Sequence, residues 1–202
     1  MNLVKDQFKE LHKGDLRTLL RIYWENKPIY KSQYFWIAVT CSITAIVLPN
    51  LIPISKIVFI ELLANKAISI FPSILGFSLG GYILLISLNS TDILNVITEP
   101  TDEKEKYSFY QKASAVFAFS ILLQALSIII GLFIVLIIDI GDTIIVFYTI
   151  AEILNSIALF ISIFVMSYAL LLIVQIILNI FNFGQVLHFF IRVENLEKEN
   201  KN

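Results

Sequence analysis

Charged residues are scarce in this chain: Asp, Glu, Lys and Arg make up 15% of its 202 residues, whereas a typical soluble domain has about 25%. Lys and Arg are absent from four apolar stretches, at residues 34–54, 68–88, 113–138 and 144–183. Each stretch is long enough to cross a hydrocarbon core of ~30 Å at about 1.5 Å per residue. The lack of charge therefore excludes a soluble globular domain and predicts an integral membrane protein.

Residues that carry chemistry are also few. The one cysteine, Cys41, excludes a disulfide framework within one chain, and the two histidines, His12 and His188, lie near opposite ends. The zinc-protease, Cys-x-x-Cys, nucleophile-elbow and P-loop patterns are all missing. We therefore expect no enzyme, no metal site and no cofactor.

What remains is mostly apolar, with 57% hydrophobic residues and a mean hydropathy of +0.81. We predict an all-α fold with one membrane domain, because the polar segments are too short to bury cores of their own. Residues 55–67 form either an interfacial helix or an extension of the second span. The predicted organisation is an amphipathic cytoplasmic segment at 1–31, a membrane domain at 32–183 with spans at about 34–54, 68–88, 113–138 and 152–180, and a cytoplasmic tail at 184–202.

The basic residues are segregated along the chain. Seven precede the first span, three lie between the second and third spans, and three lie in the tail, so 13 of the 15 fall on one side of a four-span protein. The other side holds Lys56 and Lys66. Because Lys and Arg concentrate in cytoplasmic loops, both termini and the central loop are predicted to be cytoplasmic.

Residues 3–24 have the pattern of an amphipathic helix, with apolar residues at spacings of three and four. Such a helix is typical of an anchor on the inner leaflet. The less favoured alternative is a docking site for a cytoplasmic partner or an anionic nucleotide or nucleic-acid ligand. Its basic residues recur every four positions: Lys5, Lys9, Lys13, Arg17 and Arg21.

The central loop at 89–112 carries acids that include Asp102 and Glu103. The loop is either simply solvated or a surface that attracts a partner or cations at the cytoplasmic side.

Polar residues inside the spans are costly in lipid unless they face protein or water. On the fourth span, Glu152, Asn155 and Ser162 share one helical face, and Leu159 and Met166 continue it. These residues either hydrogen-bond between helices or line a pore, with polar ends flanking an apolar constriction that gates by dewetting. The third span adds three further polar residues, Ser120, Gln124 and Ser127.

The second span carries small residues at helix-packing spacing. Gly76 and Gly80 form a Gly-x-x-x-Gly pair, and Ser73 and Gly81 extend the small face. Such a face lets another helix approach closely. The partner is either a helix of the same protomer or a helix of a second protomer.

Residues 72–82, Pro-Ser-Ile-Leu-Gly-Phe-Ser-Leu-Gly-Gly-Tyr, resemble a stretch in small four-span membrane proteins of bacterial antiphage-defence operons. The membrane subunits of the Hailong and Kiwa systems are similar in layout. The resemblance implies an oligomeric, preferably tetrameric, effector in the bacterial inner membrane. A Hailong-type effector resembles a gated ion channel restrained by a nucleic-acid ligand, and a Kiwa-type subunit docks a DNA-binding partner.

From these observations we expect a channel-like defence effector gated by a cytoplasmic partner or nucleotide signal. The alternative is a non-conducting sensor or scaffold that recruits a cytoplasmic DNA-binding partner. A small transporter subunit is a third interpretation, disfavoured because the two halves show no repeat.

The charge segregation predicts a topology that cysteine labelling can check. In a Cys41→Ser background, Asp142→Cys should react with an impermeant thiol reagent from outside the cell. Glu103→Cys should react only after the membrane is opened, because the positive-inside rule places its loop in the cytoplasm. Labelling of Glu103→Cys in intact cells would contradict the four-span arrangement.

Overall fold

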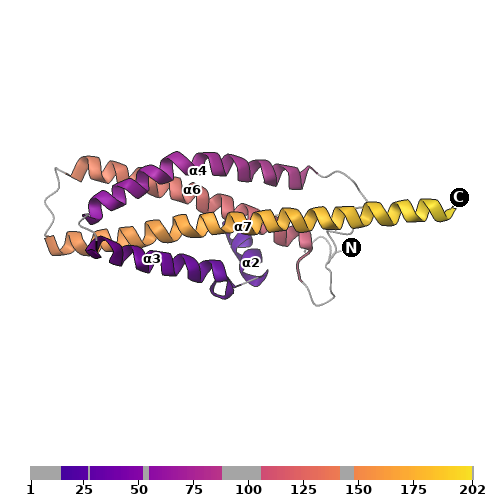
Figure 1. Ribbon diagram of the computed structural model, residues 1–202, viewed down its shortest axis with the longest axis horizontal. Coiled ribbons are helices and arrows are strands. Elements are labelled where there is room, and N and C mark those ends of the chain that lie inside the picture. The colour runs from indigo at the N-terminus through magenta and orange to yellow at the C-terminus, as the bar shows by residue number, and fades with distance from the viewer. Residues whose placement is uncertain (1–14, 27, 52–54, 88–105, 142–147, 202) are drawn as a thin grey trace. The chain divides into compact units, whose positions relative to one another are not determined.

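The fold is known from a computed structural model, which describes residues 15–26, 28–51, 55–87, 106–141 and 148–201. All secondary structure in these ranges is helical, which confirms the prediction of an all-α fold. The elements are drawn in Figure 1 and run α2 (Leu16–Asn26), η1 (Ile29–Lys31), α3 (Gln33–Leu51), α4 (Lys56–Ile86), α6 (Phe109–Gly141) and α7 (Tyr148–Lys201).

Three of the described helical segments are long and apolar enough to cross a membrane: Lys56–Ile86, Phe109–Ile140 and Ile150–Val193. A fourth is present if Leu16–Lys31 and Gln33–Leu48 are counted together as one broken span. The chain therefore has three or four candidate spans, and its helices are compatible with a multi-pass membrane protein.

Two helices extend beyond the predicted spans. Residues 56–67 are the first part of α4, so the extension of the second span, rather than a separate interfacial helix, is what forms. Helix α7 continues past residue 184, where the membrane domain was expected to end. A change from apolar to charged composition does not stop a helix, because Glu, Lys and Leu all favour helix and no proline follows. The change in composition therefore indicates where the surroundings of the helix change, but not where the helix ends.

Prolines lie both near a helix end and inside a helix of this chain. Pro49 lies within α3, which runs on to Leu51, and Pro72 lies inside α4. Proline is tolerated in transmembrane helices, because neighbouring groups satisfy the backbone carbonyls that it frees. Two predicted features lie partly outside the described residues: positions 3–14 of the helix expected over 3–24, and positions 89–105 of the central loop.

The chain divides into two compact units, and each is described separately below. The α2 unit comprises Met1–Pro28, Gly81–Phe119 and Val174–Asn202, and the four-helix unit comprises Ile29–Gly80 and Ser120–Ile173.

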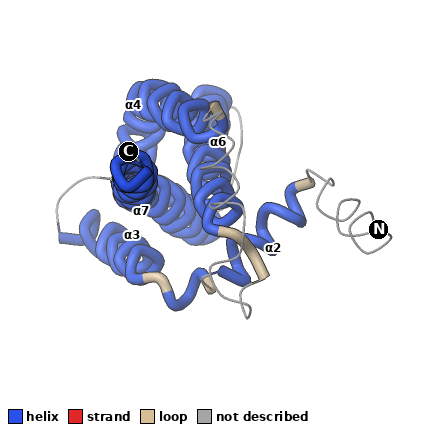
Figure 2. The backbone as a smooth tube through the Cα atoms, turned by 90° about the vertical axis from the view of Figure 1, so that its right-hand side faces the viewer, coloured by secondary structure: helices blue, strands red, loops and turns tan. Residues whose placement is uncertain are grey.

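In the four-helix unit, α3, α4, α6 and α7 run alongside one another, as Figures 1 and 2 show for these four helices. Each of the four contributes to one apolar cluster, in which Ala45, Ile60, Ile134 and Leu159 come from α3, α4, α6 and α7 respectively. Near the start of α3, the ring of Phe35 packs edge-on against Phe164 of α7, with ring centroids 5.6 Å apart. The buried apolar stripes of all four helices therefore meet in one core.

Helices α4 and α6 approach each other closely at Gly131. A Cβ atom there would lie 3.0 Å from the carbonyl oxygen of Ala64 and 3.3 Å from the Cβ of Ala67. Small residues on both helices allow this approach, as is common where membrane helices pack. Gly131 is thus a packing residue of the four-helix unit, which the sequence analysis did not single out.

In the α2 unit, helix α2 begins where the Asp15 carboxylate accepts a hydrogen bond from the Thr18 N–H at 2.8 Å. Hydrogen bonds from the Thr18 side chain and then from its backbone lower the pKa of Asp15. Near its other end, the ring of Tyr23 lies against Phe119, with centroids 4.2 Å apart. The Glu25 carboxylate accepts hydrogen bonds from Lys106 Nζ at 3.0 Å and from the Tyr107 hydroxyl at 2.9 Å. The apolar core of this unit is Leu85, Ala113, Phe117, Ile176 and Phe183.

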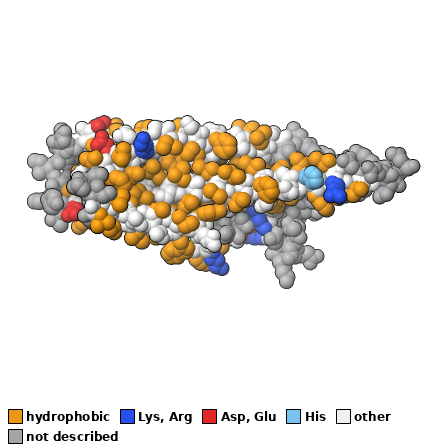
Figure 3. Space-filling view, viewed as in Figure 1, with side chains coloured by type: hydrophobic (Ala, Val, Ile, Leu, Met, Phe, Trp, Pro, Cys, Tyr) orange, Lys and Arg blue, Asp and Glu red, His pale blue; other side chains and the backbone are white. Residues whose placement is uncertain are grey.

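The outer surface of the four-helix unit is apolar. Many large hydrophobic side chains on its helices are exposed, among them Ile43, Leu62, Phe77 and Phe133. Figure 3 shows a face on which hydrophobic side chains predominate and charged ones are few. This is the surface expected of helices that contact lipid rather than water.

Candidate functional site

The interior of the four-helix unit is polar at several levels. Buried hydroxyl and amide side chains come from α3, α4, α6 and α7: Ser42, Ser78, Ser120, Gln124, Ser127 and Ser162. Because polar groups are expensive away from water, their concentration in one helical unit makes this interior the candidate functional site.

A charged mouth, formed by Lys56, Glu152 and Ser156, lies at one end of the four-helix unit. Lys56 Nζ donates to Glu152 Oε1 at 3.2 Å and to Ser156 Oγ at 3.1 Å. Lys56 is the first residue of α4 and Glu152 the fifth residue of α7. The pair therefore ties together the starts of two candidate spans that are 96 residues apart in sequence.

The second level is an apolar plug, formed by Ala45, Ile60, Leu159 and Ile163. Leu159 is its centre and is 0% exposed. Leu159 follows Glu152 by two turns of α7, so the plug lies about 10 Å inward from the charged mouth. The plug closes the interior with apolar side chains from three helices.

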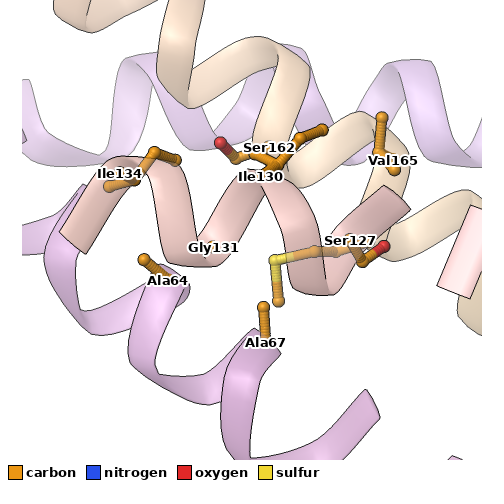
Figure 4. Close-up of a pocket in the computed structure, with 9 residues that line it drawn as sticks. Ala64, Ala67, Ser127, Ile130, Gly131, Ile134, Ser162 and Val165 are labelled. Carbon is orange, nitrogen blue, oxygen red and sulfur yellow. The ribbon is translucent and has the colours of Figure 1, made fainter. Parts of the chain in front are cut away.

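The third level is a small cavity below the plug, with a volume of about 10 Å³. Its walls come from α4, α6 and α7, and Figure 4 shows Ala64 and Ala67 of α4 pointing toward the turn of α6 that holds Gly131. Two hydroxyls line it, those of Ser127 and Ser162, and each donates to a carbonyl of its own helix. A volume of this size holds at most one water molecule.

The fourth level is an amide cluster, formed by Ser78 of α4 with Ser120 and Gln124 of α6. Gln124 Nε2 donates to Ser78 Oγ at 3.0 Å and to Ser120 Oγ at 3.1 Å. Gln124 is fully buried, and its Oε1 has no hydrogen-bond donor among the described residues. The cluster thus joins α4 to α6 and keeps one unused acceptor inside the unit.

The residues predicted to line a pore are placed in and around these levels. Glu152 is exposed at the mouth, Asn155 is half-buried, and Leu159 belongs to the plug. Ser162 and Met166 line the small cavity. The face that they share points into its own protomer, because Leu159 and Ser162 are buried by neighbouring helices.

The small face of α4 divides into two parts. Ser73, Gly76 and Gly80 are exposed, and a Cβ atom at either glycine would meet nothing within 4 Å. Gly81 differs from these three. Its Cβ would lie 3.3 Å from Phe117 Cε1, so Gly81 packs inside the α2 unit and is not part of an open face. Only the first three remain candidates for contact with another protomer.

The predicted cytoplasmic ligand residues are only partly placed. Arg17 and Arg21 are exposed on α2, whereas Lys5, Lys9, Lys13, Asp102 and Glu103 lie outside the described residues. Hydrogen bonding to Glu25 is the main cause of the raised pKa of Lys106. In the described part of the chain, no group of three His, Cys, Asp or Glu side chains comes together to hold a metal ion.

Sequence reasoning missed two members of the site, Lys56 and Gly131. Lys56 was placed on the outer side, in an interfacial helix or an extension of the second span, and only the folded chain brings it to Glu152. A signal for Gly131 was present, because Ser127 and Gly131 are four residues apart and form a small-x-x-x-small pair on α6.

Ser78→Ala should weaken the unit, because it removes one of the two acceptors of Gln124. The expected loss is about 0.6–2 kcal/mol in the free energy of unfolding, the range of interhelical hydrogen bonds in membranes. Unfolding by sodium dodecyl sulfate in mixed micelles would measure it. Ser73→Ala, on the exposed face of the same helix, is the matched control and should change nothing. If the two variants lower the free energy of unfolding equally, the amide cluster does not stabilise the contact between α4 and α6.

In comparisons with known proteins, no family model, no curated protein and no solved structure matches this chain.

Proposed function

We propose that this chain is a channel-like membrane effector, held closed by the apolar plug. The observation that carries the proposal is the alternation of levels inside the four-helix unit. The charged mouth lies on one side of Leu159, and the hydroxyls of Ser127 and Ser162 lie on the other. A hydrophobic constriction between polar regions is an arrangement that gates ion flow by dewetting.

The described conformation corresponds to a closed state. The cavity below the plug is too small for a column of water, and Leu159 has no exposure. Opening requires α7 to move away from α4 and α6, so that Glu152, Ser162 and Met166 reach water together. The contacts that resist this movement are the Lys56–Glu152 ion pair and the packing of Leu159.

The cellular role in this proposal is antiphage defence at the bacterial inner membrane, with both termini in the cytoplasm. The defence context rests on the resemblance of residues 72–82, and the orientation rests on the segregation of the basic residues. In this proposal a cytoplasmic partner, or a nucleotide or nucleic-acid signal, releases the gate. Lipid surrounds a homo-oligomer, for which a tetramer is favoured.

The alternative function is a non-conducting sensor or scaffold that recruits a cytoplasmic DNA-binding partner. One observation favours it. Such a scaffold would present residues 1–31 and 89–112, and in the described parts of these segments Glu25 accepts hydrogen bonds from Lys106 and Tyr107 within the α2 unit. A joined pair of segments offers a partner a preformed surface.

Leu159→Ser should open a leak, because a hydroxyl at the centre of the plug favours entry of water. A barrier lower by about 1.4 kcal/mol would raise the ion flux roughly tenfold. Flux should be measured on purified protein in liposomes and planar bilayers. Met166→Ser, beside the cavity, should leak in the same way, and Glu152→Gln should reduce cation flux through either leaking variant.

The matched control for the leak is Leu154→Ser, which changes a 55% exposed leucine on the same helix. It should not conduct. If Leu159→Ser and Met166→Ser both assemble but conduct no ions in bilayers, the scaffold function is favoured. Residues that only pack would destabilise the protein when changed, without creating conductance.

Two glycine substitutions should separate folding from assembly. Gly131→Leu should destabilise the four-helix unit by about 1–3 kcal/mol or more, since its side chain has no space beside Ala64. Gly76→Leu should leave the melting temperature unchanged, because its side chain enters open space, but should disrupt a contact between protomers.

Melting curves in detergent and native-size measurement are the two readouts for the glycine variants. If Gly76→Leu and Gly80→Leu both keep the parental assembly, the exposed glycine face is not a protomer contact.

A further inference from the structure

An open groove adjoins the charged mouth of the four-helix unit. It has a volume of about 460 Å³, which is in the range of ligand sites. Its apolar wall comes from α3 and α7, and the ion pair and Ser156 lie at its polar end. The residues of the wall are Ile46, Ile153, Ile157 and Phe160. The groove thus has one charged end and one apolar side.

The ion pair keeps unused hydrogen-bonding capacity toward the groove. An ammonium group has three donors, and Lys56 uses two of them, on Glu152 Oε1 and Ser156 Oγ. Glu152 Oε2 makes no hydrogen bond or ion pair with any described residue, and the Glu152 side chain is 52% exposed. One cationic N–H and one carboxylate oxygen therefore lie side by side and remain available.

The position of the groove selects the class of ligand. Lys56 and Glu152 lie at the starts of two candidate spans, which is the level at which lipid headgroups meet the hydrocarbon core. The wall residues 153–160 then extend about 10 Å along α7 toward the core. A ligand that fits must carry both charges at its head and an apolar chain behind it.

We propose that this groove binds a zwitterionic phospholipid with a primary ammonium headgroup, as in phosphatidylethanolamine. The phosphate oxygen accepts the free N–H of Lys56, and the ammonium group donates to Glu152 Oε2. One acyl chain lies along Ile153, Ile157 and Phe160. A choline headgroup carries the positive charge but has no N–H to donate, and a glycerol headgroup has no positive charge to face the carboxylate.

This proposal is independent of conduction, because it concerns only the outer edge of the mouth. A lipid in the groove would contact α3, α4 and α7 at once and would hold their ends together.

Native mass spectrometry of the delipidated full-length protein would test the site. Phosphatidylethanolamine, phosphatidylcholine and phosphatidylglycerol with identical acyl chains should be titrated separately. The ethanolamine lipid should bind about tenfold more tightly than the other two, the scale of one charge-assisted hydrogen bond. Lys56→Gln and Glu152→Gln should each abolish this preference.

Two variants on the exposed surface of α4 are the matched controls. Lys66→Gln and Glu61→Gln remove one charge of each sign from the same helix, and neither residue lines the groove. Both should keep the tenfold preference, and circular dichroism should confirm that all four variants fold. A loss of preference in the controls equal to that at Lys56 and Glu152 would overturn the proposal.

The apolar wall needs a test of its own. Ile157→Trp should fill the groove and reduce binding of the ethanolamine lipid about tenfold or more. Ile161→Trp, one turn along the same helix but not part of the groove, should not. Equal binding of all three lipids would overturn the lipid assignment, and so would equally tight binding of water-soluble phosphoethanolamine. The assignment would also be overturned if the groove is covered by a second copy of the chain and not by lipid.

Discussion

Polar side chains inside these apolar helices have to find their partners within the protein, because lipid offers none. Most hydroxyls do so on their own helix. Ser42, Ser127 and Ser162 each donate to the carbonyl four residues earlier, at 2.7–2.9 Å. Such groups need no second helix and say little about packing. In the four-helix unit, the Gln124 amide and the Lys56 and Glu152 charges instead bond to a second helix, and these bonds tie helices together.

The arrangement of the four-helix unit follows from these few ties and from side-chain size. The ion pair joins α4 to α7 at the mouth, and the amide cluster joins α4 to α6 further along. Between them, Gly131 lets α6 approach Ala64 and Ala67 closely. Leu159 fills the space that remains among α3, α4 and α7. Polar ties at two levels and close packing between them define a closed interior, with room for one water molecule at most.

The charged mouth both joins two helices and remains accessible to a ligand. A fully buried ion pair would be costly to desolvate, but Glu152 is half exposed and keeps access to the headgroup level. The pair can therefore hold two helix ends together while presenting a donor and an acceptor to a ligand. A polar mouth above an apolar plug can serve a gate, and an apolar groove beside it can serve a lipid. The two roles use neighbouring surfaces of the same residues.

The glycines of this chain show how a single residue type serves different purposes in one helix. Gly76 and Gly80 face open space on α4, whereas Gly81, one residue further, packs against Phe117. Sequence spacing identified all three as one small face. Helical rotation of 100° per residue separates Gly81 from Gly80, and only the neighbouring helix decides which of them is covered.

The sequence by itself predicted the all-helical class and the helices long and apolar enough to cross a membrane, because length and hydropathy are properties of each segment and need no partner. It also identified Glu152, Ser162 and Gln124 as unusual, since a polar residue on an apolar helix can be recognised from the sequence alone. Only the tertiary structure decided what these residues face. Lys56 contacts Glu152, which is 96 residues away in sequence, and Leu159 is completely covered by its neighbours. Helical periodicity states which residues share a face but not which neighbour covers it, because that depends on the packing of all four helices at once.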